Sequence, residues 1–428
     1  MIEIFLFFFS YSFMQLRVVN LSLLIIMLFA PQFFLNISTI LSVPSGSEVL
    51  GYVGTAANSQ TVLSCNDEAL VFVECQGWQL HIPSDYDYRG TVVVIDDGLS
   101  IDQWKKLENG YFGFQVDIVR YVTPDVNGFP ISFGDYGDDS LTGLDNSDLG
   151  YFSPNGVGQD HGFAVISALA TIVPNVKIIF VNAQIRYGEI VGEGFQIDRD
   201  VGIWTWLRDN ANVFDIDVIT ISLNSGTSNA VVSSRIEDLY AKGIFMISSI
   251  GNEGIYQGNV FPQSHSKIYA VGSVDHEDRG TTSDPDKYSK EGFYSGFAVS
   301  SDLYSSYGGP YASRADSLDF TMPGNGVPIV SYNQNQWVYG VGTSFSAPYL
   351  AAAALIAVYA YNQGYLSAGG VFSDPSAATI YSILKSVSSQ NRYDSNNGWG
   401  YVTFLSVYNQ AYSEGYGSIT CGSSFCLF

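Results

Sequence analysis

Four polar side chains of this chain each stand where an apolar segment begins or ends, and each has a chemistry used in acyl transfer. They are Asp96 directly after TVVVI, His161 at the start of HGFAVISALATIV, Asn252 after IFMISSIG, and Ser344 before FSAPYLAAAALIAV. Hydrolysis through a covalent serine intermediate needs a nucleophile, a base, a carboxylate that orients the base, and a donor for the oxyanion. The set therefore predicts a serine hydrolase.

The position of Ser344 suits a nucleophile. The apolar run after it is long enough for a buried helix, and Pro348 fits only in the first turn, where its missing N–H loses no hydrogen bond. A helix start gathers unpaired N–H groups and partial positive charge, which stabilise negative charge beside the serine oxygen. A plain helix N-cap is the alternative explanation for a serine at this place.

Each of the other positions also has a purely structural explanation. The sequence Asp96, Asp97, Gly98 is typical of a turn, a histidine such as His161 often packs or caps a helix, and Asn252 fits a loop turn. The chain has only four histidines, and His161 is the one at the start of an apolar helix. Because serine hydrolysis requires all four groups, their joint presence favours the catalytic interpretation.

The elements that must position these groups alternate between strands and helices after residue 90. The expected strands are TVVVID, KIIFV, DVITISL, IFMISSIG and IYAVGSV. Helices are expected from residue 161, around 198–210, around 231–241, from residue 344 and around 377–386. This alternation predicts an α/β fold with a mostly parallel central sheet and helices on both faces. Active sites of such sheets form beyond the carboxyl ends of the strands.

In the order Asp, His, Asn, Ser, these motifs resemble the subtilisin family of serine peptidases, over about residues 90–414. ITISLNSG resembles the substrate-strand segment of that family, FPQSHSKIYAVGSVD its strand after the oxyanion asparagine, and NNGWGYVTFLSVYNQAY its closing helix motif. The paired aspartates of DDG resemble the kexin branch. The resemblance implies a subtilisin-like fold and endopeptidase activity on polypeptides, with no cofactor required for catalysis.

The resemblance also implies a role for each motif residue. Asp96 orients the imidazole, His161 takes the proton, Ser344 attacks, and Asn252 binds the oxyanion together with the Ser344 N–H, whereas Asp97 is not a triad member. The residues that the resemblance expects to contact substrate are Ser222, Leu223, Asn224, Ser225 and Gly226 of the substrate-strand segment, and Gly251 and Glu253 on either side of Asn252.

The sequence departs from the family pattern at several places. Asn224 replaces a usual glycine, which changes a wall of the specificity pocket, and Phe345 stands where methionine is common. Roughly 45 residues between the export segment and the catalytic region are too few for the usual folding propeptide, so the chain is expected to fold unaided.

Composition excludes one class of partner. Lys and Arg number 18 against 41 Asp and Glu, for a net charge of -23, so nucleic acid is not expected to bind. The segment from Leu21 to Val43 is apolar and uncharged, which predicts an export signal, with an uncleaved membrane anchor as the alternative. The expected location is extracellular or at the cell surface, and the oligomeric state is left open.

Four regions are expected: an export segment over 1–47, an N-terminal extension over 48–90, the peptidase domain over 91–414, and a tail over 415–428. The extension contains a hairpin-like stretch and two cysteines, Cys65 and Cys75, and the tail contains Cys421 and Cys426. Disulfides are expected in an exported chain, and pairing within each couple is simplest, although four cysteines allow three connectivities.

A Gly-rich acidic loop predicts a structural calcium site, with a solvated acidic loop as the alternative. Its carboxylates are Asp135, Asp138, Asp139, Asp145 and Asp148.

Two other classes of protein compete with a subtilisin-like peptidase. A sedolisin-type acid peptidase uses a glutamate base and an aspartate in the oxyanion position, where this chain has His161 and Asn252. A non-catalytic relative could serve as a surface or binding module, but all four catalytic positions are intact.

Overall fold

The computed structural model describes residues 70, 73–83, 88, 90–125, 129–134, 145, 149, 161–183, 197, 200–223, 229–252, 261–274, 318–324, 326–330, 337–340, 342–393 and 397–420. The chain divides into two compact units, residues 1–52 and 53–428, and all described residues belong to the second.

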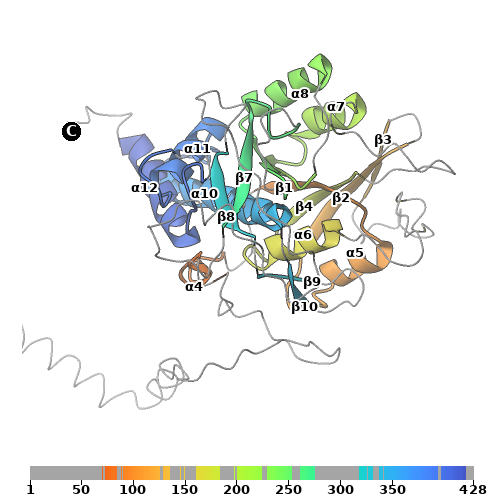
Figure 1. Ribbon diagram of the computed structural model, residues 1–428. Coiled ribbons are helices and arrows are strands. Elements are labelled where there is room, and N and C mark those ends of the chain that lie inside the picture. Colours follow the sequence, from red (N-terminus) through yellow and green to blue (C-terminus); the bar gives the residue numbers. More distant parts are fainter. Residues whose placement is uncertain are drawn as a thin grey trace, which may run out of the picture. The chain divides into compact units, whose positions relative to one another are not determined.

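An eight-stranded sheet forms the centre of the second unit (Figure 1). Its order is β3-β2-β4-β1-β5-β6-β7-β8, and every neighbouring pair is parallel except β2 with β3. The strands are β1 (Thr91–Asp96), β2 (Asp117–Pro124), β3 (Pro130–Phe133), β4 (Lys177–Asn182), β5 (Ile216–Ile221), β6 (Phe245–Ser249), β7 (Ile268–Val274) and β8 (Phe320–Pro323). The expected α/β class with a mostly parallel sheet is confirmed.

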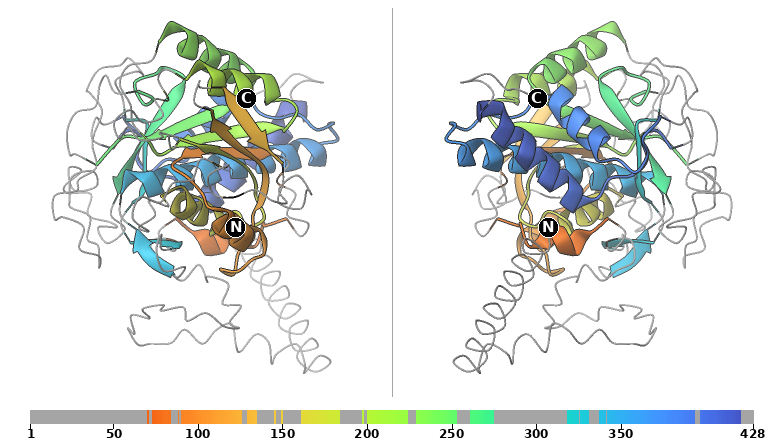
Figure 2. Two further views of the ribbon diagram at one scale, coloured as in Figure 1. Left: turned by 90° about the vertical axis from the view of Figure 1, so that its right-hand side faces the viewer. Right: turned by 90° about the vertical axis from the view of Figure 1, so that its left-hand side faces the viewer.

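Helices cover both faces of the sheet, with α7 (Val201–Asn210) and α8 (Ala230–Ala241) on one side and α6 (His161–Ala170) and α10 (Thr343–Ser367) on the other (Figures 1 and 2). Successive side chains of β1 point to opposite faces of the sheet. Val92 and Val94 belong to the apolar cluster under α6 and α10, while Val93 and Ile95 belong to the cluster under α7 and α8. Because side chains alternate along a strand, Asp96 falls on the side of α6 and α10.

The long helix α10 passes through the core. It is long and apolar enough to cross a membrane, but 94% of its most apolar window is buried inside the protein, as in a core helix. It packs against β5, β6, β7 and β8 and against α12 (Phe404–Thr420). Pro348 is the sixth residue of α10 and lies in its second turn, not in the first turn as expected, because the helix begins at Thr343. The Ser344 carbonyl, which the missing N–H of Pro348 leaves free, accepts from Ser222 Oγ instead. The remaining elements are α5 (Ile101–Glu108), α11 (Ala377–Ser386) and the hairpin of β9 (Val327–Val330) and β10 (Trp337–Gly340).

The described end of the N-terminal extension is helical. The sequence predicts a hairpin-like stretch, but residues 75–79 form the short helix α4 (Cys75–Gln79), which packs against α12. Trp78 is fully buried and donates from its indole to the carbonyl of Ile172 at 2.8 Å, and the Phe404 N–H donates to the carbonyl of Val73 at 3.0 Å. Tertiary packing of the indole therefore overrides the β propensity of the neighbouring residues.

Cysteine pairing stays a prediction. Cys75 is buried and carries no free thiol, whereas Cys65, Cys421 and Cys426 lie outside the described residues. The export segment also lies outside them.

A buried carboxyl group lies at the start of β5. Asp217 is 8% exposed, and its Oδ2 is buried without a hydrogen-bond partner in the part of the chain that the structure describes. Burial, followed by the charges of Asp374 and Asp215, raises the pKa of Asp217 well above its usual value. The group is therefore most compatible with the fold when it is protonated.

Candidate active site

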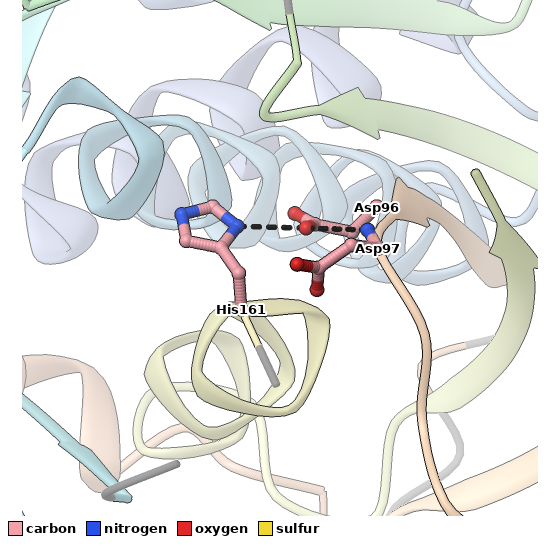
Figure 3. Close-up of side chains that lie close together, drawn as sticks. All are labelled: Asp96, Asp97 and His161. Carbon is pink, nitrogen blue, oxygen red and sulfur yellow. Dashed lines mark hydrogen bonds and ion pairs between the residues drawn. The ribbon is translucent and has the colours of Figure 1, made fainter. Parts of the chain in front are cut away.

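Asp96 and His161 are brought together across the end of the sheet. Asp96 is the last residue of β1 and is fully buried, while His161 is the first residue of α6 and its side chain is 25% exposed. The His161 Nδ1 lies 2.7 Å from Asp96 Oδ1 (Figure 3). Figure 3 also shows that Nε2 points away from both carboxylates. This geometry sets the tautomer with the proton on Nδ1 and leaves Nε2 as the basic nitrogen.

The electrostatics of the imidazole are dominated by two opposing effects. Burial lowers the pKa of His161, but the charge of Asp96, its hydrogen bond to the ring and the charge of Asp97 together outweigh burial and raise the pKa from 6.5 to about 9. The ring therefore carries its proton more strongly than a free histidine does. A base in this position is fully available only in alkaline solution.

The imidazole of His161 also contacts an aromatic ring from α10. The ring centroids of His161 and Phe345 are 5.7 Å apart, and Phe345 is 2% exposed. Because Phe345 directly follows Ser344, this contact holds the start of α10 beside the start of α6.

Ser344 is the second residue of α10 and is 9% exposed. Gly342 occupies the N-cap position with φ 139°, a conformation that favours glycine. The Ser344 carbonyl accepts a hydrogen bond from Ser222 Oγ at 3.0 Å, which fastens the end of β5 to the helix start. The Ser344 N–H belongs to the first turn, where intrahelical acceptors are lacking.

Asn252 lies against the same helix start. Its Oδ1 accepts from the Thr343 N–H at 2.8 Å and from the Thr343 hydroxyl at 3.1 Å. The hydroxyl of Thr343 in turn accepts from the Gly251 N–H at 3.2 Å. With Oδ1 occupied twice, the amide is held in one orientation, and its Nδ2 donates to no group in the described part of the chain. The amide of Asn252 is thus fixed against Thr343, the residue before Ser344.

Sequence reasoning missed the contribution of two residues. Thr343 anchors Asn252, and Asp97 bonds both to Asp96 and to the Gly162 N–H that follows His161. Phe345, which the sequence singles out beside the nucleophile, contacts His161. Asp97 of the aspartate pair and Thr343 before Ser344 are visible in the sequence, but the sequence pattern does not indicate which groups their side chains contact.

The expected substrate-contacting residues are described only in part. Ser222 is buried, Leu223 is half-buried and Gly251 is buried, at the ends of β5 and β6. Asn224, Ser225, Gly226 and Glu253 lie outside the described residues.

The expected calcium ligands fall mostly outside the described residues: Asp135, Asp138, Asp139 and Asp148. Asp145 is described and exposed, and calcium binding stays a prediction. Within the described ranges, one group of three residues could hold a metal ion, Asp96, Asp97 and His161, with ligand atoms within 4.8 Å of one another. His161 Nδ1 and Asp96 Oδ1 are already hydrogen-bonded to each other, which favours a carboxylate that orients the imidazole over a metal site.

The model of the subtilase family matches residues 137–400. The chain belongs to the subtilase family. The matched region contains His161, Asn252 and Ser344 and begins after Asp96. The assignment of Asp96 to the site therefore rests on its hydrogen bond to the imidazole.

Two known proteins are similar to this subtilase. A subtilisin from Bacillus sp. (strain TA39) is 25% identical over 138 residues, which is 32% of this chain and 30% of that protein. The chain thus matches less than a third of the length of this curated relative. The crystal structure of a lanthipeptide protease has a TM-score of 0.53 and 18% identity, over 84% of this chain and 98% of that one. This likeness shows a shared fold.

Proposed function

We propose that this subtilase is a serine endopeptidase that hydrolyses peptide bonds through an acyl-enzyme on Ser344. The observation that carries the proposal is the 2.7 Å bond from His161 Nδ1 to the buried carboxylate of Asp96, because it directs the basic nitrogen away from the carboxylate. The contact between His161 and Phe345 supports it by holding the imidazole beside the nucleophile's helix.

In the proposed mechanism, His161 Nε2 takes the proton from Ser344 Oγ as the oxygen attacks the peptide carbonyl. Asp96 keeps the imidazole in the required tautomer and stabilises the imidazolium that forms. Asn252 Nδ2 and the Ser344 N–H donate to the oxyanion. His161 then gives the proton to the leaving amine, and the acyl group remains on Ser344 as an ester. Water attacks this ester while His161 takes its proton, and His161 finally returns the proton to Ser344 Oγ as the acid leaves.

We infer that the substrate is an extended polypeptide. Ser222 and Leu223 follow β5, and Ser222 bonds to Ser344, so an extended chain can add as a further strand beside the nucleophile. The apolar segment near the N-terminus supports secretion or retention at the cell surface, and structural calcium in the acidic loop remains part of the proposal.

The rival functions have less support. A sedolisin-type acid peptidase needs carboxylates where this site has His161 and Asn252. A non-catalytic binding module has no need of an asparagine amide that Thr343 holds in one orientation.

The test is labelling with a fluorophosphonate together with cleavage of unfolded casein. The protein should label on Ser344 and cleave casein, and Ser344→Ala should do neither. Ser346→Ala is the matched control, since its hydroxyl lies in the same helix but donates to the carbonyl of Met322 at 3.0 Å. That control should label and cleave, with about 1 kcal/mol less stability. Full casein cleavage by Ser344→Ala would refute the proposal.

A further inference from the structure

Asp97 connects the carboxylate and the base of the site from the residue that follows β1. Its N–H donates to Asp96 Oδ1 at 2.8 Å, the same oxygen that receives His161 Nδ1 (Figure 3). Its own Oδ1 accepts from the Gly162 N–H at 2.9 Å, in the first turn of the helix that carries His161. Asp97 therefore bonds to the carboxylate of the pair and to the residue that follows its histidine.

The start of α6 also lies directly against the main chain of Asp97. A Cβ atom added at Gly162 would lie 2.4 Å from the carbonyl oxygen of Asp97 and 2.8 Å from the ring of Phe180. Only a residue without a side chain permits this approach. The helix start is consequently held by a side-chain bond and by close packing at the same point.

We propose that Asp97 is a positioning residue, which fixes the backbone of His161 relative to Asp96 and adds a second negative charge beside the imidazole. The inference rests on the proposed function of the site. It assigns to Asp97 two separable effects: a geometric one through its Oδ1 and its main chain, and an electrostatic one through its charge.

The charged groups that face the imidazole in the described part of the chain are Asp96 at the end of β1 and Asp97 after it. From α10 the ring meets Phe345, which is uncharged. The charge of Asp97 contributes to the raised pKa of His161. Asparagine keeps an oxygen acceptor for the Gly162 N–H and removes the charge, whereas alanine removes both, so the two variants separate the effects.

The experiment titrates the histidines of the full protein by NMR and measures kcat and KM against pH. His161→Gln identifies the signal of His161 among the four histidines. Asp97→Asn should lower the pKa of His161 by about one pH unit, as expected for a charge within 4.8 Å that is partly screened by water. Asp102→Asn, an exposed change on α5, controls for net charge and should not move that signal.

The geometric effect is measured at alkaline pH, where kcat no longer changes with pH. Asp97→Ala should lower kcat about tenfold below the value of Asp97→Asn, with KM within about twofold, because a displaced base slows the proton transfer more than it weakens binding. An unmoved His161 signal in Asp97→Asn overturns the electrostatic effect, and equal plateau kcat values of the two variants overturn the geometric one. If Asp97→Ala does not fold, the Asp97→Asn titration decides. The titration needs no turnover, so an inactive native protein would refute the proposed function alone.

Discussion

Replacing Gly162 by alanine is expected to damage the site more than the fold. The added Cβ would lie 2.4 Å from the carbonyl oxygen of Asp97 and 2.8 Å from two ring atoms of Phe180, whereas ordinary contact begins at 3.4 Å. The backbone at the start of α6 must therefore move by about 1 Å, and His161 must move with it. Neither neighbour can yield freely, since one is main chain and the other is a buried ring.

The expected magnitudes follow from this displacement. Overpacking in a tight core costs about 1–3 kcal/mol, and the better helix propensity of alanine returns about 0.5–1 kcal/mol, so the net loss of stability is at most about 2.5 kcal/mol. A 1 Å displacement of a catalytic group costs roughly a hundredfold in rate. We therefore expect kcat/KM to fall about a hundredfold while Tm falls by only a few degrees.

The assay is hydrolysis of a chromogenic peptide ester beside a thermal melt. Gly417→Ala is the matched control, because the same substitution in α12 brings the new Cβ within 4 Å of no other group. This control should gain about 0.5–1 kcal/mol and keep its activity. If Gly162→Ala retains more than a third of the native kcat/KM, His161 is not held against Asp97 as the geometry requires, and the reasoning is wrong.

Three further results are expected. The kcat/KM should rise with pH through an apparent pKa of about 9, as His161 loses its proton; a plateau already reached at pH 7 would contradict the raised pKa. The carboxyl of Asp217 has a raised pKa, so its stabilising effect is present in acid and is lost as pH rises through that pKa. Raising the pH from 4 to 8 should therefore lower the Tm of Asp217→Asn less than that of the native protein. An equal fall in Tm for both proteins would count against a buried protonated carboxyl. Peroxide should spare the native activity, because Met246 and Met322 are fully buried, whereas Phe345→Met places an oxidisable sulfur beside His161 and should become peroxide-sensitive. Equal sensitivity of both proteins, with Met246 and Met322 intact by mass spectrometry, would refute that placement.

Much of the sheet could be predicted from the sequence, because its central strands are β-branched and buried on both faces. TVVVID, KIIFV and IYAVGSV all correspond to strands of the structure. The helix over 377–386 begins and ends as expected, since Ser376 caps it. By contrast, β2 has no recognisable pattern: DIVRYVTP mixes charged and apolar residues, and it forms a strand because β4 pairs with it.

The site was predictable as a set of residue types but not as a network. Motif order pointed to Asp96 and His161, and their hydrogen bond fits that expectation. The two hydrogen bonds from Thr343 to Asn252 Oδ1 and the hydrogen bond from Gly162 to Asp97 join residues far apart in the sequence. No local sequence pattern records such contacts. The raised pKa of His161 likewise comes from two carboxylates together, which a motif match does not reveal.

The bond between the Phe404 N–H and the Val73 carbonyl links the two ends of the described chain, and this has a consequence for biosynthesis. Helix α4 is made long before α12, yet Trp78 on α4 is buried against Tyr359 on α10 and Tyr408 on α12. Contacts between such distant segments form late and slowly. A nascent chain therefore cannot complete this part of its core before α12 has left the ribosome, so Trp78 stays without its burying partners until more than 300 further residues have been made.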